Sequence, residues 1–158
     1  MKVKKTTTTH VLEAKEFIRD RRSPTPSNVM TSRVMSHNKA KNTGPEIILR
    51  SALWTNGFRG YRLHWKKTPG SPDIVYTIKK VAIFVNGCFW HRCPYCKPHS
   101  PQTNTSFWNN KFVANAERDK RKTDQLIQLG WRVITIWECQ VKKDLDEQLD
   151  KISKIYYE

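Results

Sequence analysis

Residues 71–96 read SPDIVYTIKKVAIFVNGCFWHRCPYC and combine two apolar runs with the start of a cysteine-rich loop. The runs at residues 74–78 and 81–85 are rich in β-branched side chains and are separated by two lysines, which predicts a β-hairpin. The loop that follows, at about residues 87–102, is long and polar. We therefore expect a bound metal, rather than a hydrophobic core, to hold this loop in place.

A helix is predicted on the N-terminal side of the hairpin. Thr43 suits an N-cap, Pro45 suits a first helical turn, and Gly57 can end the helix. The pattern at residues 61–65 then predicts a strand. The apolar face of the helix is expected to consist of Ile47, Ile48, Leu49, Ala52 and Leu53.

The pattern after the loop predicts a long helix, a strand and a final helix. The long helix covers about residues 106–129, and the strand at residues 131–137 (WRVITIW) is apolar enough to be buried. The whole order predicts an α/β fold with a mixed central β-sheet flanked by helices. Core positions are expected at Leu126, Ile127 and Leu129 in the long helix and at Leu145, Leu149 and Ile152 in the last one.

The charge balance points to a polyanionic partner. The chain has 29 Lys and Arg residues against 14 Asp and Glu, a formal net charge of +15. Nucleic acid is the expected partner, and a basic solubilising surface is the alternative. No apolar run approaches the length of a membrane span, and the N-terminus has no apolar leader segment, which argues against secretion. We expect residues 1–30 to form a basic arm and linker, with a short helix at residues 11–22, and residues 31–158 to form the folded domain.

Four cysteines predict a structural metal site. Three fall within nine residues and include a C-x-x-C knuckle, and the fourth follows the last predicted strand. Four thiolates favour a closed tetrahedral zinc site, whereas free buried cysteines are the alternative. His91 and His99 are further possible ligands. The four cysteines are Cys88, Cys93, Cys96 and Cys139.

Asp73 and His91 are the candidate catalytic residues. Asp73 precedes an apolar strand, where a carboxylate can hold a hard cation such as Mg²⁺, although Pro-Asp is also a common turn pair. Many magnesium nucleases carry an acidic residue, a spacer and a lysine on the next strand, but residues 84–86 here read FVN. His91 in the adjacent loop can accept a proton instead. A zinc ligand and a phosphate contact are its alternative roles.

Three ordered motifs resemble the very short patch repair (Vsr) endonucleases. They are VNGCFWH at residues 85–91, ERD at residues 117–119, and GWRV at residues 130–133 leading to WEC at residues 137–139. The resemblance covers roughly residues 35–139. Members of this family nick DNA 5′ of the thymine in a T:G mismatch, which arises when 5-methylcytosine deaminates. The resemblance implies a magnesium-dependent DNA endonuclease with a restriction-endonuclease-like fold.

The resemblance also assigns roles to particular residues. It implies that Asp73 binds the catalytic magnesium ion, that His91 activates the attacking water, and that Asp119 orients His91. Glu46 corresponds to a glutamate near the active centre. Asn86 stands where some members carry a second active-site histidine, and an asparagine can bind a phosphate but cannot carry charge.

Further resemblances concern the DNA and the structural metal. Phe89 and Trp90 correspond to aromatic residues that wedge into the base stack, and Met35 to a wedge from the N-terminal segment. Core packing is the alternative for the aromatic pair. The structural zinc positions fall at or near the four cysteines, where members often include a histidine. The implied partner is double-stranded DNA with a T:G mismatch, and the implied enzyme is bacterial, cytoplasmic and nucleoid-associated, with a functional link to a cytosine-5 DNA methyltransferase and repair proteins. We expect a monomer, because nicking one strand needs only one active site.

Two other functions fit part of the pattern. A sequence-specific restriction or nicking endonuclease of the same fold would also need Asp73 and His91. A non-catalytic, zinc-stabilised DNA-binding module would account for the charge and the cysteines, but not for the ordered appearance of Asp73, His91 and Asp119.

Overall fold

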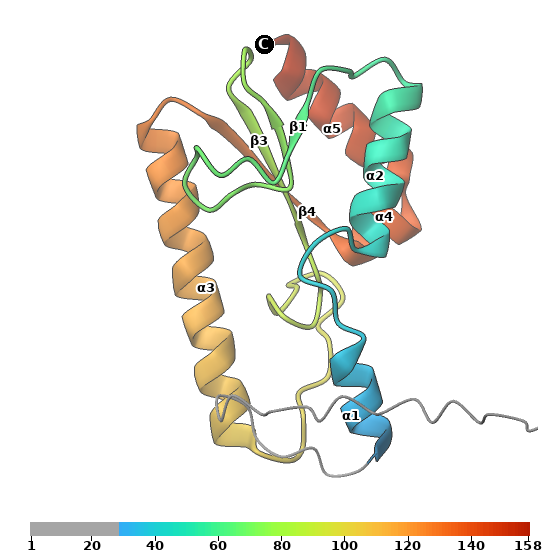
Figure 1. Cartoon of the computed structure of the whole chain (residues 1–158), viewed down its shortest axis with the longest axis vertical. Helices are drawn as coiled ribbons and strands as arrows, with labels where there is room; N and C mark the ends of the chain where they lie inside the picture. Colours follow the sequence, from blue (N-terminus) through green and yellow to red (C-terminus); the bar gives the residue numbers. More distant parts are fainter. Residues whose placement is uncertain (1–28) are drawn as a thin grey trace, which may run out of the picture.

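The described part of the chain, residues 29–158, forms one mixed four-stranded β-sheet with helices around it (Figure 1). The computed structural model describes residues 29–158, so nearly all of the predicted arm, with its helix at residues 11–22, lies outside the described residues. The strand order is β1-β2-β3-β4, with antiparallel β1/β2 and β2/β3 pairs and a parallel β3/β4 pair. The strands are β1 (Arg62–Leu63), β2 (Ile74–Tyr76), β3 (Val81–Asn86) and β4 (Arg132–Trp137).

Helices flank the sheet on both sides (Figure 1). The 24-residue helix α3 lies alone on one side, while α2, α4 and α5 lie together on the other. Parallel neighbours cannot be joined by a tight turn, and α3 provides the crossover from β3 to β4. The helices are α1 (Val29–Ser36), α2 (Gly44–Thr55), α3 (Thr105–Gln128), α4 (Glu138–Lys143) and α5 (Leu145–Tyr157).

The main core lies between the sheet and the three-helix layer. Side chains alternate along a strand, so Ile83 and its neighbours two positions away in β3 pack together with Leu49 and Leu53 of α2. Leu149 and Ile152 of α5 belong to the same cluster. The α/β class, the mixed sheet and the predicted hairpin are therefore confirmed.

Several predicted details are wrong. Ile47 and Ile48 of α2 are 50% and 43% exposed, and Ile127 and Leu129 are more than half exposed. Only one stripe of each helix packs against the sheet. Of the three core positions predicted in the long helix, Leu126 alone is therefore buried. Two short helices, α1 and α4, were not expected from the sequence. Among residues 29–158, no helix is both long and apolar enough to cross a membrane.

Replacing Ile83 should test the importance of the central strand. Ile83 is completely buried, so Ile83→Ala should lower the free energy of unfolding by about 2–5 kcal/mol. Ile78, in the turn between β2 and β3, is 97% exposed and provides the matched control. Chemical denaturation followed by circular dichroism gives both values. Similar losses for Ile83→Ala and Ile78→Ala would contradict this description of the core.

Candidate active site

A cleft of about 790 Å³ is lined by the charged residues that were predicted as catalytic, Asp73, His91 and Asp119 among them. Its walls come from α2, α3, the end of β3 and the segment at residues 37–41. Exposed cations surround it and form what we call the basic rim, which consists of Lys39, Lys41, Lys111, Arg118 and the half-buried Lys122. Inside the rim lie the groups of the candidate active site, which are Glu46, His64, Asp73, Asn86, His91 and Asp119.

Asp73 lies immediately before β2 and is held by the neighbouring strand. Its Oδ2 accepts a hydrogen bond of 2.8 Å from the backbone N–H of Val85 in β3. Burial raises the pKa of the Asp73 carboxyl above its usual range, because the charged form is poorly solvated there, and the bond from Val85 opposes this shift. The carboxylate is thus fixed in position but lacks full charge compensation.

Glu46 caps the start of α2 and also reaches the cleft. Its carboxylate accepts hydrogen bonds from the hydroxyl of Thr43 at 2.9 Å and from the N–H of Asn42 at 3.0 Å. These contacts use the predicted N-cap at Thr43 and leave Glu46 only 3% exposed. Glu46, His64 and Asp73 each offer one ligand atom, and these atoms lie within 4.8 Å of one another, a spacing that can hold a metal ion.

His91 and Asp119 form a hydrogen-bonded pair in the same cleft. The Nδ1–H of His91, in the loop after β3, donates to the Asp119 carboxylate on α3. That bond fixes the ring tautomer and leaves Nε2 as the nitrogen that can accept a proton. Asn86 lines the cleft at the end of β3, opposite Trp137 in the sheet register. The structure therefore brings Asp73, Asn86, His91 and Asp119 together.

The four cysteines converge at the ends of β3 and β4. Their sulfur atoms lie within 4.8 Å of one another, and Cys93 Sγ is 3.6 Å from Cys139 Sγ. That separation is far too long for a disulfide but close to the edge of a tetrahedron with metal–sulfur bonds of about 2.3 Å. The cluster can hold a metal ion, and His91 lies outside it.

Phe89 and Trp90 belong to an aromatic cluster with α3. The Phe89 ring lies 5.3 Å from Trp108 and 5.5 Å from Phe112, centroid to centroid. Both residues of the pair remain half-buried, and Trp90 lines the cleft, so packing occupies only part of their surface. Met35 is half-buried near the end of α1, just before the segment that lines the cleft.

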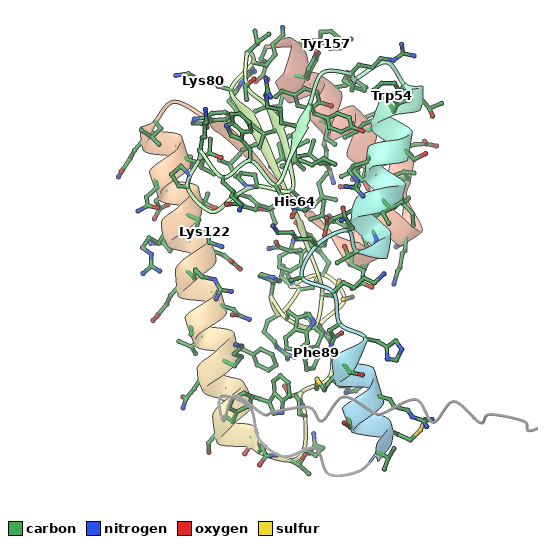
Figure 2. The ribbon with its side chains drawn as sticks, in the orientation of Figure 1. Trp54, His64, Lys80, Phe89, Lys122 and Tyr157 are labelled. Atoms are coloured by element: carbon green, nitrogen blue, oxygen red, sulfur yellow. The ribbon has the colours of Figure 1, made fainter. Side chains whose placement is uncertain are left out.

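His64 is the residue that the sequence analysis missed. It follows β1 and has a φ of 46°, which a strand pattern cannot predict. Figure 2 shows it near the centre of the molecule, between α3 and α2. Its side chain is 14% exposed and lies between Glu46 and Asp73. A lone histidine beside a short strand carries no local signal, because its partners come from distant parts of the chain.

Comparison with known proteins shows relatives along most of the chain. The family model described as DNA mismatch endonuclease Vsr matches residues 26–97. The chain is 42% identical over 126 residues to the type II nicking enzyme V.NaeI of Lentzea aerocolonigenes, which covers 77% of this chain and 75% of that protein. It is 41% identical over 109 residues to the type II nicking enzyme V.NmeAIP of Neisseria meningitidis, with coverage of 69% and 77%. The DNA mismatch endonuclease Vsr of Escherichia coli is 38% identical over 102 residues, with 65% of each chain covered.

Removing the charge of Asp73 should stabilise the protein when no divalent cation is added. The folded state holds this carboxyl at a raised pKa, so its ionisation opposes folding. Asp73→Asn keeps an oxygen for the Val85 N–H and should raise the melting temperature at neutral pH. The advantage should be smallest below pH 3.8, the ordinary pKa, where the carboxyl is protonated in both states, and should grow as the pH rises towards the raised pKa of the folded state.

Thermal denaturation across this pH range gives the comparison. Asp150 is exposed on α5, and Asp150→Asn provides the control that should change little. A lower melting temperature for Asp73→Asn than for wild type at neutral pH would contradict the assignment of a destabilising buried charge.

Proposed function

The chain belongs to the Vsr family of endonucleases, and from this premise we propose that it nicks one DNA strand 5′ of the thymine in a T:G mismatch. Such a nick would initiate very short patch repair of deaminated 5-methylcytosine. The observation that carries the proposal is that Asp73 and the hydrogen-bonded His91–Asp119 pair line the same cleft, inside the basic rim.

The chemistry divides between two groups of residues. His91 accepts a proton from the attacking water, and Asp119 holds the imidazole in the required tautomer and stabilises its charged form. Asp73 and Glu46 would hold Mg²⁺, which when bound neutralises charge on the scissile phosphate. Asn86 can donate a hydrogen bond to a phosphate oxygen but has no charge to contribute.

Basic side chains hold the DNA, and side chains inserted into the base stack distinguish a mismatched base pair from a matched one. The basic rim contacts phosphates without regard to sequence. Phe89 and Trp90 from the loop, and Met35 from α1, insert beside the mismatch. Unstacking a step costs a few kcal/mol, and a mismatched pair costs less to open, which favours T:G over T:A.

The remaining parts of the proposal concern the scaffold and the cell. Zn²⁺ is the ion that four cysteines favour, and it would serve as a structural ion because no ligand position stays open. The sheet with helices on both sides fits a restriction-endonuclease-like fold. A monomer is sufficient to cut one strand. A cytosine-5 DNA methyltransferase, whose product gives rise to the mismatch, is the expected functional partner on the nucleoid of the bacterial cytoplasm.

A second function is favoured by the names of two relatives. V.NaeI and V.NmeAIP are type II nicking enzymes, so cutting one strand within a fixed sequence, with or without a mismatch, is the alternative. The same cleft would serve both activities, so only the choice of DNA substrate can distinguish one from the other.

A nicking assay on two matched duplexes tests the proposal. One duplex carries T:G in a cytosine-methylation context, and the other carries T:A at the same position. We expect a Mg²⁺-dependent nick in the T-containing strand of the first duplex alone. Asp73→Ala should abolish the nick while retaining DNA affinity, because one negative charge near the phosphates is lost.

The control variant is Asp150→Ala, which removes an exposed aspartate outside the cleft and should nick like wild type. Equal cutting of both duplexes would support the sequence-specific alternative. DNA binding without cutting, across several sequence contexts, would overturn the proposal of an endonuclease.

Loss of one cysteine should remove the structural metal. Cys93→Ser should abolish stoichiometric Zn²⁺ binding and lower the melting temperature, since the ion contributes directly to folding. Burial raises the pKa of the Cys88 thiol, so metal binding must displace its proton and should weaken as the pH falls. Co²⁺ substitution followed by absorbance, together with thermal denaturation, measures both effects. Wild-type stability that does not change on zinc removal and re-addition would contradict a structural ion.

A further inference from the structure

His64 has no role in the proposed chemistry, yet it lines the cleft and lies between two of its carboxylates. Its N–H donates to the Asp73 carbonyl oxygen at 3.2 Å, so the β1/β2 pairing places it beside Asp73. Its φ of 46° lies in the left-handed region, which few non-glycine residues adopt. The ring lies between two carboxylates, with Nε2 3.6 Å from Glu46 Oε2 and Nδ1 3.6 Å from Asp73 Oδ1.

Within the described part of the chain, neither carboxylate has a lysine or arginine as its counterion. Among residues 29–158, no Lys or Arg nitrogen lies within 4.0 Å of Glu46 or Asp73. The chain has 29 Lys and Arg residues, so a shortage of basic side chains is not the reason. Two largely buried carboxylates side by side are costly without a compensating cation. A cation taken from solution would compensate the charge of these two carboxylates.

The imidazole offers such a cation a nitrogen ligand. His64 Nε2 is buried and has no hydrogen-bond partner within the described part of the chain. Its contacts of 3.6 Å are too long for hydrogen bonds. The carboxylates are oriented by backbone groups, Val85 N–H for Asp73 and Asn42 N–H for Glu46. Fixed oxygen ligands and an unused imidazole nitrogen are the features of a metal site.

We propose that His64 is a direct ligand of the cation held by Glu46 and Asp73, and that it shifts the site from Mg²⁺ towards transition-metal ions. The inference rests on the proposed role of Asp73 as a metal ligand. Mg²⁺ prefers oxygen ligands and near-ideal octahedral geometry, whereas imidazole favours transition metals. Mn²⁺ also suits carboxylate-rich sites, which makes it the appropriate test ion for a mixed oxygen and nitrogen ligand set.

Binding of Mn²⁺ to the full-length, zinc-loaded protein without DNA provides the test. Isothermal titration measures affinity, and pulsed electron paramagnetic resonance detects hyperfine coupling from a directly bound imidazole nitrogen. Wild type should show this coupling. His64→Gln should lose it and bind Mn²⁺ about tenfold more weakly or worse, while Mg²⁺ affinity changes much less, because the glutamine oxygen suits Mg²⁺.

Two matched variants complete the design. His37 lies on the same cleft but outside the cluster, and His37→Gln should retain both the coupling and the Mn²⁺ affinity. Asp73→Asn should weaken binding of both ions. If His64→Gln does not fold, as judged by circular dichroism, His64→Asn replaces it.

The outcomes separate this inference from the proposed function. Mn²⁺ binding that depends on Asp73 but shows no nitrogen coupling in wild type would overturn the role of His64 and leave the proposed function standing. Coupling that persists in His64→Gln would also overturn it. If the protein does not bind Mn²⁺, or if Asp73→Asn does not change its Mn²⁺ affinity, the proposal of a metal site at Asp73 is overturned.

Discussion

The parallel pairing of β3 with β4 brings the functional parts of this protein together. In the register of this pair, Asn86 lies opposite Trp137, so the next residues of both strands emerge at the same edge of the sheet. Cys88 and Cys139 therefore meet, and the Cys139 N–H lies 3.3 Å from Cys88 Sγ. The crossover that parallel strands require is α3, and this helix carries Asp119 back to His91. One pairing thus sets both the cysteine cluster and the histidine–carboxylate pair.

Regular elements could be predicted from the sequence because their signals are local. The cap at Thr43 and the β-branched runs each act on their immediate neighbours, and α2 and the β2–β3 hairpin follow from them. The short helices α1 and α4 were missed, because eight and six residues carry too little periodicity to be distinguished from loops. The exposure of Ile127 depends on which stripe of α3 meets the sheet, which composition does not encode.

The candidate site was predictable only where residues lie in ordered motifs. Asp73 and His91 were identified from their positions beside the predicted strands, and Asp119 through the resemblance to a family; the structure brings all three into one cleft. His64 belongs to no such motif. Its importance arises from the β1/β2 pairing and from a left-handed backbone angle, both of which are tertiary properties. The cations of the cleft lie on its rim and are mostly exposed, whereas its carboxylates are half-buried or, for Glu46, buried.

The separation of the cysteines along the chain has a consequence for folding kinetics. Cys88, Cys93 and Cys96 are close in sequence and can capture an ion in an otherwise unfolded chain, but Cys139 lies 51 positions after Cys88. Closing a loop of that length costs entropy that only the completed sheet and crossover can offset. The fourth sulfur therefore arrives last. In a chain that ends before Cys139, a bound ion would have an incomplete and exchangeable ligand shell. A closed shell would therefore form only after β3 and β4 have paired.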